Sequence, residues 1–332
     1  MKRFIIIVLL SILCFLSIIS IAYIVISVYG FIFYNRYKNV VYKSFYNDIH
    51  CGKIYCNETI NYDLTIPKFT QEYDKKTAQY CINLIEIIYE ITGSDFKSPN
   101  GLKKELSLTY DDKSNIFAVL WSTSDTLFII FRGTLNLEDW VNDATYQQNA
   151  YVESKQSTNS QISVNYRVAR KNTNGQTGLS YIELPASIHK GFYTIYNKMK
   201  TTLIDKLSQL DPTKTKNIVI AGHSLGSAVA TICAADLYAL GYKNCVTYVF
   251  ASPRVGNEKF SAIIKNLNLY SIMNNLDVVP TMPTAVSPNF GDENQPNIFN
   301  ESGTIFRFSE NWKSIYNNHS LKIHNDFLPD TI

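Results

Sequence analysis

Residues 217–240 read NIVIAGHSLGSAVATICAADLYAL, and this run restricts the fold of the chain more than any other stretch. Its first part, NIVIAG, is a short apolar segment of the kind that forms a buried strand. Its second part, from LGSAV onward, has the length and the small, apolar composition of a buried helix. Between them, Ser224 stands between Gly222 and Gly226. The run therefore predicts a tight strand-to-helix turn at Ser224.

The same alternation of elements continues along the chain. A helix is expected near 192–210, before the turn, and the strand VTYVFAS, the helix NEKFSAIIKNL and the strand LYSIMNN follow it. Upstream, NIFAVLWS and TLFIIFRG indicate two adjacent strands, and KKTAQYCINLIEIIYEITG carries its apolar residues on one helical stripe. Strands that alternate with helices predict an α/β fold with a mainly parallel sheet covered by helices on both faces. Sites on such sheets lie at the carboxyl ends of the strands.

Residues 135–185 interrupt this pattern. They are mostly polar, with a possible strand at QISVNYRVA and a turn-like KNTNGQTG. The segment is long for a loop in a compact domain, and such a length is typical of either a functional or a mobile segment.

The N-terminal residues 4–34 contain no charged side chain. As a helix they would be about 46 Å long, more than the roughly 30 Å hydrocarbon core of a bilayer. We expect an uncleaved transmembrane anchor there, with residues 35–74 as a stalk and packing segment and residues 75–332 as the main folded domain. A cleaved signal peptide is the alternative, although its apolar region is normally shorter. Basic residues on both flanks leave the orientation open.

Composition excludes several other classes of function. The formal net charge of +3 is small and no run of basic residues concentrates it, so nucleic acid is not an expected partner. The cysteines do not resemble a zinc site. Only Cys51 and Cys56 share a polar segment, where a disulfide and two free thiols are equally compatible with the sequence. No metal or organic cofactor is expected, and the oligomeric state is open.

A strand-to-helix turn gives Ser224 the setting of a nucleophile elbow. In so sharp a turn, side chains at Gly222 and Gly226 would collide with neighbouring backbone. The turn also aims the helix N-terminus and the backbone N–H of Leu225 at any oxyanion formed on a carbonyl that Ser224 attacks. A glycine-rich turn with an incidental serine is the alternative.

Four stretches together resemble the class 3 (fungal-type) lipase family, whose members have an α/β-hydrolase fold. They are IIFRGTLNLEDWVND, IHKGF, VIAGHSLGSAVA and FASPRVGNEKF, in the family's order and approximate spacing. The resemblance covers residues 75 to 330. It implies a serine esterase whose triad follows the chain order Ser, Asp, His.

The resemblance also implies the partners of Ser224. Asp277, at the end of the apolar run in LYSIMNNLDVVPTMP, fits the family's Asp-x-Val-Pro pattern, and alone it would be an ordinary aspartate in a strand-ending turn. NNHSLKIH resembles the terminal histidine motif with His319 as the base, and His324 is the alternative. Asp277 would hold the tautomer of His319 and stabilise its imidazolium.

The remaining histidines receive other roles. His50 lies in the stalk, and His189 belongs to the HKGF signature, where a structural role is expected. His223 lies inside the elbow and is expected to pack or to form a hydrogen bond beside the serine.

By resemblance, FRGT supplies the second oxyanion donor through the backbone N–H of Thr134, with its hydroxyl as a further candidate. LNLEDWVND, just after it, fits a short amphipathic lid, although Trp140 packed on the domain fits equally well. The resemblance implies a triacylglycerol-lipase-like hydrolase of acyl esters of lipids. Phospholipase A1 and diacylglycerol lipase are the alternatives, and a noncatalytic membrane interaction protein is the rival from another class.

Sequons at Asn57, Asn300 and Asn318 would carry glycans if the domain faces a lumen or the exterior. The sequon at Asn318 adjoins the predicted base His319, where a glycan would crowd the cleft. We therefore expect Asn318 to be unmodified.

Overall fold

The computed structural model describes residues 64–91, 96–110, 115–134, 148–150, 165–171, 177–183, 186–287 and 297–332. All of them fall within Ile54–Ile332, which forms one compact unit. The expected anchor 4–34, the Cys51 and Cys56 pair, the sequon at Asn57 and the expected lid 135–143 lie outside the described residues. Within the described part of the chain, no helix is both long and apolar enough to cross a membrane.

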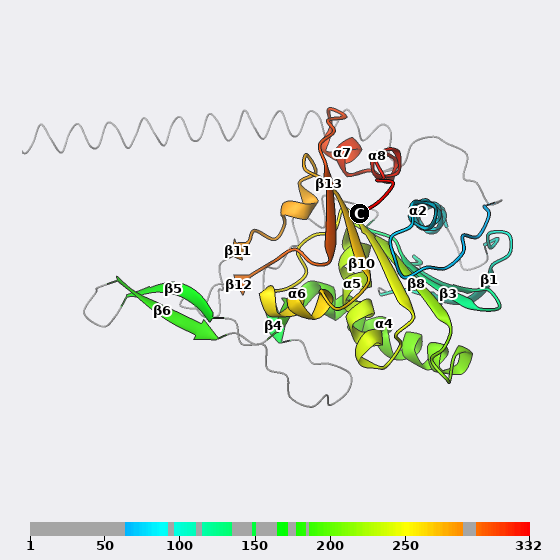
Figure 1. Cartoon of the computed structure of the whole chain (residues 1–332), viewed down its shortest axis with the longest axis horizontal. Coiled ribbons are helices and arrows are strands. Elements are labelled where there is room, and N and C mark those ends of the chain that lie inside the picture. Colours follow the sequence, from blue (N-terminus) through cyan, green and yellow to red (C-terminus); the bar gives the residue numbers. More distant parts are fainter. Residues whose placement is uncertain are drawn as a thin grey trace, which may run out of the picture. The chain divides into compact units, whose positions relative to one another are not determined.

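A seven-stranded sheet forms the centre of the molecule (Figure 1). Its strands, in spatial order, are β1 (Lys103–Leu108), β2 (Ala118–Ser122), β3 (Thr126–Phe131), β8 (Asn217–His223), β9 (Cys245–Phe250), β10 (Leu269–Asn274) and β13 (Thr304–Phe308). The β1–β2 and β2–β3 pairs are antiparallel, and every pair from β3 to β13 is parallel. The predicted mainly parallel sheet is confirmed.

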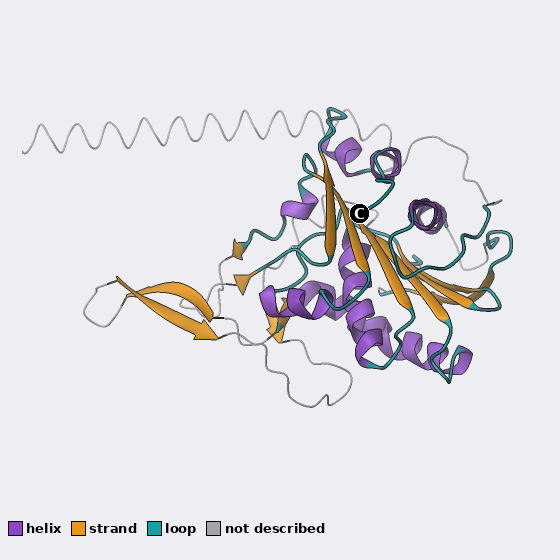
Figure 2. Cartoon of the chain, in the orientation of Figure 1, coloured by secondary structure: helices purple, strands orange, loops and turns teal. Residues whose placement is uncertain are grey.

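Helices cover both faces of this sheet (Figure 2). They are α2 (Lys75–Glu90), α4 (Lys190–Leu210), α5 (Leu225–Ala239), α6 (Glu258–Ile264), α7 (Ile315–His319) and α8 (Leu321–Asp326). Strand β8 shows why both faces are buried: Ile218 and Ile220 join the core cluster under α4 and α5, whereas Val219 and Ala221 join the one under α2. Side chains of a strand alternate between faces, so a wholly apolar strand must be covered twice.

Residues before the expected domain boundary also contribute to the core. Leu64, Ile66, Phe69 and Tyr73 pack against the cluster under α2. The backbone N–H of Asp74 donates to the Tyr248 hydroxyl, and the Asp74 carboxylate accepts from the Thr77 N–H at the start of α2. The C-terminal part of the segment 35–74 is therefore packed on the domain.

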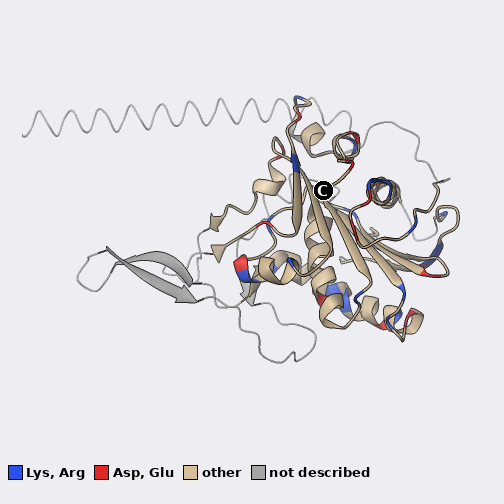
Figure 3. Cartoon of the chain, in the orientation of Figure 1, with Lys and Arg blue, Asp and Glu red and all other residues tan. Residues whose placement is uncertain are grey.

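Charged residues are absent from the central strands β8, β9 and β10, which Figure 3 shows without blue or red. Arg132, just after β3, is a buried cation, with 4% of its surface exposed. Its Nε donates to the Ile116 carbonyl and its Nη1 to the Gly133 carbonyl, both at 2.6 Å. A buried guanidinium is tolerated where such acceptors surround it, and here it fixes the chain end that follows β3.

Several elements were not predicted. The edge strands β1 and β13 and the short helices α7 and α8 carry weak periodicity, and their positions depend on pairing and packing with distant segments. The smaller sheets pair β4 (Gln148–Ala150) with β7 (Ser187–His189), β5 (Asn165–Lys171) with β6 (Thr177–Glu183), and β11 (Val286–Ser287) with β12 (Asn297–Ile298). The strand expected near 161–169 is β5, shifted toward the C-terminus.

Candidate active site

Ser224 occupies the turn between β8 and α5, as the sequence predicted. Its backbone has φ 56° and ψ −126°, a conformation that a residue with a side chain rarely adopts. The turn is held on both sides, because the Ser224 N–H donates to the Phe250 carbonyl at 3.0 Å and its carbonyl accepts the Ser227 N–H at 2.9 Å. The strained conformation is therefore fixed by β9 and by the first turn of α5.

The two glycines of the turn lie against backbone. A Cβ atom at Gly222 would overlap the carbonyl oxygen of Gly226, and one at Gly226 would overlap the carbonyl oxygen of Arg132. The second contact joins the start of α5 directly to the chain end after β3. Glycine at both positions is what allows the elbow to approach that chain end.

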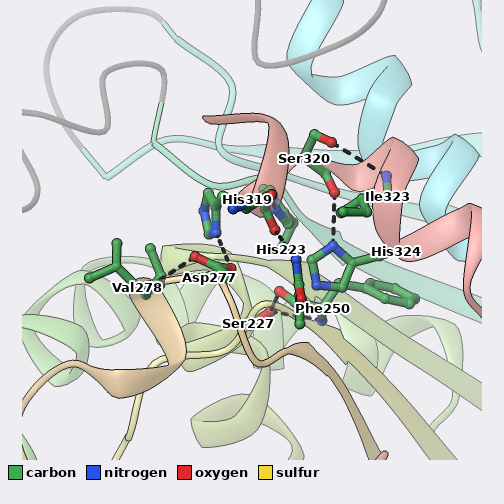
Figure 4. A network of polar contacts seen from close by, with 12 residues as sticks. His223, Ser227, Phe250, Asp277, Val278, His319, Ser320, Ile323 and His324 are labelled. Carbon is green, nitrogen blue, oxygen red and sulfur yellow. Dashed lines mark hydrogen bonds and ion pairs between the residues drawn. The ribbon is translucent and has the colours of Figure 1, made fainter. Parts of the chain in front are cut away.

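Asp277 and His319 meet at the carboxyl end of the sheet, where Figure 4 shows them side by side. Nδ1 of His319 lies 2.6 Å from Oδ2 of Asp277, and both residues are buried. The other carboxylate oxygen, Oδ1, accepts the Val279 N–H at 2.9 Å. Since the carboxylate accepts at both oxygens, Nδ1 of His319 carries the proton and Nε2 is left as the free base nitrogen.

The Oγ atom of Ser224 and the Nε2 atom of His319 are buried, and neither has a hydrogen-bond partner among the described residues. Each residue exposes only 1% of its surface. Buried polar atoms are normally paired, so orphaned ones call for an explanation. Nε2 of His324 is a buried atom without a partner as well, but only His319 is also bonded to Asp277. Ser224 Oγ and His319 Nε2 are the atoms that a serine nucleophile and its base would use.

The chain end after β3 lies beside the nucleophile. A Cβ built on Gly133 would be 3.0 Å from Cβ of Ser224. Because Arg132 binds the Gly133 carbonyl, and because the C=O and N–H of a trans peptide point in opposite directions, the Thr134 N–H points away from the guanidinium. Leu225 is the first residue of α5, so its N–H has no acceptor within the helix.

The other described histidines are occupied elsewhere. His189 caps α4, since its Nδ1 accepts the N–H groups of Gly191 and Phe192 at 3.1 and 3.4 Å, and burial lowers its pKa to about 4. His324 lies 2.8 Å from the Ser320 carbonyl through Nδ1, and burial lowers its pKa to about 4 as well. Among the described residues, His324 forms no hydrogen bond or ion pair with the Asp277 carboxylate, so the structure pairs Asp277 with His319.

His223 forms two hydrogen bonds within the site. Its Nδ1 lies 2.7 Å from the Tyr89 hydroxyl, and its Nε2 lies 2.8 Å from the His319 carbonyl. Burial, followed by the neighbouring His319 and His324, lowers its pKa well below the usual value. His223 is therefore neutral.

Two further residues support the site and were missed in the sequence. Tyr89 lies in the last turn of α2, and its hydroxyl oxygen accepts the Gly133 N–H at 2.8 Å. Asn274 is fully buried at the end of β10 and bonds the segments that carry Asp277 and His319. A tyrosine in an aliphatic helix and an asparagine at the end of a buried strand each need polar partners, and that need was the available signal.

Sequence comparisons find lipases and phospholipases among the proteins that this chain is similar to. The chain is 26% identical over 194 residues to a lipase of Rhizomucor miehei, covering 55% of this chain and 44% of that lipase. It is 40% identical over 97 residues to phospholipase A1-II 1 of Oryza sativa subsp. indica, covering 27% of this chain and 23% of that protein. The chain thus spans less than half the length of these curated relatives.

A comparison of structures supports the fold. The triacylglyceride lipase of Rhizomucor miehei superimposes with a TM-score of 0.52 at 21% identity, covering 71% of this chain and 80% of that one. Together with the mainly parallel sheet and its helices, this shows the α/β-hydrolase fold. Residues 128–287, which include the elbow and Asp277, match the model of the family described as Lipase (class 3). Over residues 128–287, the chain matches the class 3 lipase family.

Proposed function

We propose that the protein is a serine hydrolase that cleaves acyl ester bonds of lipids through an acyl-enzyme, with Ser224, His319 and Asp277 as its triad. One observation carries the proposal. The Nδ1 atom of His319 is bound to Asp277 at 2.6 Å, while Nε2 of His319 and Oγ of Ser224 are both buried without partners among the described residues. That combination supports a base and a nucleophile ready for a substrate.

In the first half of the reaction, Oγ of Ser224 attacks the ester carbonyl carbon while Nε2 of His319 takes the hydroxyl proton. The carbonyl oxygen becomes an oxyanion that accepts hydrogen bonds from the backbone N–H groups of Thr134 and Leu225. The C–O bond to the alcohol then breaks, and His319 returns the proton to the leaving oxygen. Asp277 stabilises the imidazolium throughout.

In the second half, His319 takes a proton from water, and the resulting hydroxide attacks the acyl-enzyme. A second oxyanion forms in the same place and collapses to release the fatty acid, while His319 returns the proton to Ser224. All atoms balance as ester plus water giving acid plus alcohol. Apart from the ester and water, the steps use only groups of the chain.

The first test separates an enzyme from a noncatalytic interaction protein with the same fold. The full-length protein is exposed to a fluorophosphonate probe, beside Ser224→Ala as the control. We expect covalent labelling of the wild type and none of the variant. Absence of labelling in folded wild-type protein would favour the binding protein instead.

The substrate class needs a separate test. We propose acylglycerols, with phospholipids as the alternative, which the match to a rice protein named phospholipase A1 favours. The full-length protein is assayed on triacylglycerol, diacylglycerol and phosphatidylcholine in matched mixed micelles. Release of fatty acid from phosphatidylcholine alone would identify the alternative.

We also propose that residues 4–34 anchor the protein in a membrane as a single N-terminal span, with the catalytic domain luminal or extracellular. The proposal rests on the uncharged run of the sequence. Retention in the pellet after alkaline carbonate extraction would support the anchor. Protection of the catalytic domain from protease in sealed vesicles would support the orientation, and digestion there would reverse it.

A further inference from the structure

A chain of three hydrogen bonds passes beneath the candidate active site. The Gly133 N–H donates to the Tyr89 hydroxyl oxygen at 2.8 Å. That hydroxyl lies 2.7 Å from Nδ1 of His223, and Nε2 of His223 lies 2.8 Å from the His319 carbonyl. Figure 4 shows His223 directly beside His319. The chain thus joins α2, the end of β3, the end of β8 and α7.

Only one placement of hydrogens satisfies every atom of the chain. The His319 carbonyl can only accept, so Nε2 of His223 carries the hydrogen of that bond. The ring is neutral, so Nδ1 is unprotonated and accepts the proton of the Tyr89 hydroxyl, whose oxygen accepts the Gly133 N–H. Both nitrogens of His223 are therefore used, and neither is available as a base for Ser224.

The two ends of this series of hydrogen bonds lie next to the proposed oxyanion donor and the proposed base. Gly133 immediately precedes Thr134, the proposed oxyanion donor, and a Cβ at Gly133 would lie 3.0 Å from Cβ of Ser224. His223 immediately precedes Ser224, and the far end is the backbone carbonyl of His319 itself. The side chains of Tyr89 and His223 thus fix the positions of the oxyanion segment, the nucleophile and the base relative to one another.

We propose that Tyr89 and His223 are positioning residues that hold the Gly133–Thr134 peptide and His319 in their places around Ser224. The inference rests on the proposed hydrolase function, because it assigns the two residues to transition-state stabilisation rather than to substrate binding. Losing an oxyanion donor outright costs about 10² to 10³ in kcat. Displacing that donor and the base by a fraction of an ångström is expected to cost less, roughly 10- to 100-fold.

Tyr80 offers a matched control on the same helix. It is also a buried tyrosine of α2, with 3% of its surface exposed, and its hydroxyl has no hydrogen-bond partner among the described residues. Tyr80→Phe and Tyr89→Phe therefore remove the same atom from the same helix. They differ in whether that atom holds the site.

The test measures steady-state hydrolysis of a soluble p-nitrophenyl ester by the full-length wild type, Tyr80→Phe and Tyr89→Phe. We expect Tyr89→Phe to lower kcat 10- to 100-fold with KM within twofold of the wild type, and Tyr80→Phe to match the wild type. The inhibition constant of an alkylboronic acid, which forms a tetrahedral anion on the serine, should rise by the same factor as kcat falls. Equal kinetics in the two variants would overturn the inference.

A double-mutant cycle with His223→Gln tests whether the two residues act as one unit. If they do, Tyr89→Phe should have little further effect in the His223→Gln background, whereas independent multiplicative losses would contradict the chain of bonds. The ¹⁵N resonances of His223 give a readout that does not depend on turnover. We expect a neutral ring protonated at Nε2, with an Nδ1 shift that changes in Tyr89→Phe and stays unchanged in Tyr80→Phe.

These outcomes are distinguishable from failure of the proposed function. A wild type that neither hydrolyses the ester nor reacts with a fluorophosphonate would refute the hydrolase. An active wild type with a fully active Tyr89→Phe variant would refute only the positioning role.

Discussion

The Nδ2 atom of Asn274 lies 3.2 Å from the backbone carbonyl of Asn318, the residue before His319. The same side chain accepts the Leu276 N–H through Oδ1 at 3.2 Å, directly before Asp277. It also bonds both backbone groups of Glu310 after β13. One fully buried amide thus ties the segment of the acid to the segment of the base.

Replacing Asn274 by aspartate should disturb both segments. The substitution turns its two donated hydrogen bonds into oxygen-to-oxygen contacts with the carbonyls of Glu310 and Asn318. Each buried group left without a partner costs about 1–3 kcal/mol of unfolding free energy. Misplacement of His319 relative to Asp277 should lower kcat by up to about 10²-fold.

The matched control is Asn275→Asp, the same change at the exposed neighbouring position. Urea denaturation and steady-state kinetics on both variants make the comparison. An Asn274→Asp variant that resembles Asn275→Asp in stability and in kcat would contradict the role given to the buried amide.

The pairing of His319 with Asp277 predicts unequal roles for the two C-terminal histidines. Asp277→Asn should lower kcat on the order of 10⁴-fold, because the amide no longer fixes the tautomer of His319. His319→Ala should lower it at least as far. His324→Asn should retain turnover and lose stability, because His324 is buried against Phe250 and Phe308 and, among the described residues, forms a hydrogen bond with Ser320 alone.

Rates of ester hydrolysis by these three variants, with thermal melts of each, check the assignment. Equal loss of kcat in the two histidine variants, at equal stability, would contradict the assignment of His319 as the general base.

Arg132→Lys is expected to be a severe change despite the retained charge. The guanidinium donates in two directions, to the Ile116 and Gly133 carbonyls, and a lysine cannot reproduce that geometry. The Gly133–Thr134 peptide would lose its fixed orientation, so kcat should fall by about 10²-fold with little change in KM.

Arg307→Lys is the control, because Arg307 lies on the edge strand β13 with 38% of its side chain exposed and pairs with Glu301. Kinetics that are alike in the two lysine variants would show that Arg132 is not needed to hold the peptide.

The sequence could predict the elements whose signals are local. The run around Ser224 carries its strand, its turn and its helix within neighbouring residues, and β8 and α5 follow it closely. The edge strand β13 could not be predicted in this way, because its half-exposed residues lack a strong alternation and it exists by pairing with β10. Strand formation at an edge depends on such tertiary partners more than on propensity.

The same distinction between local and long-range signals applies to the residues of the candidate site. Asp277 and His319 have family motifs, whereas Tyr89 and Asn274 act through hydrogen bonds to residues far away in the sequence, and no local pattern encodes those. His223 was expected to pack or bond beside the serine, and both of its nitrogens do form bonds. Their partners could be identified only from the fold.

The free energy of unfolding should fall on acidification, because buried neutral histidines take up protons when the protein unfolds. His189 has a folded pKa of about 4, below the unfolded value of about 6.5, so its contribution is complete above pH 6.5 and is lost as the pH falls toward 4. The physical reason is that a protonated Nδ1 can no longer accept the N–H groups of Gly191 and Phe192.

His189→Asn isolates this group, because asparagine is a good N-cap that does not titrate in this range. We expect the variant's unfolding free energy to fall less steeply between pH 6 and 4.5, by about one proton or 1.4 kcal/mol per pH unit. Guanidinium denaturation at several pH values measures the two slopes. Identical slopes would show that His189 does not take up a proton on unfolding.

The sequon at Asn318 should remain unmodified even if the domain passes through a glycosylating compartment. Asn318 exposes 7% of its surface, its Oδ1 accepts the Trp312 N–H at 2.7 Å, and its Nδ2 lies 3.4 Å from the Leu276 carbonyl. A glycan on Nδ2 would have to displace the segment that leads to Asp277. Asn300, the other sequon among the described residues, is only partly buried and is therefore the more accessible of the two.

Mass spectrometry of peptides from secretory expression, before and after glycosidase treatment, tests this expectation. Active protein should show no glycan at Asn318. The variant Ser320→Ala lacks the sequon, and its Asn318 peptide should be unglycosylated, like that of the wild type. That substitution also removes the cap that Ser320 provides to α8, so stability is measured in parallel and a loss of about 1 kcal/mol is expected. A fully occupied Asn318 in active enzyme would be incompatible with its buried bonds and with His319 as the base beside it.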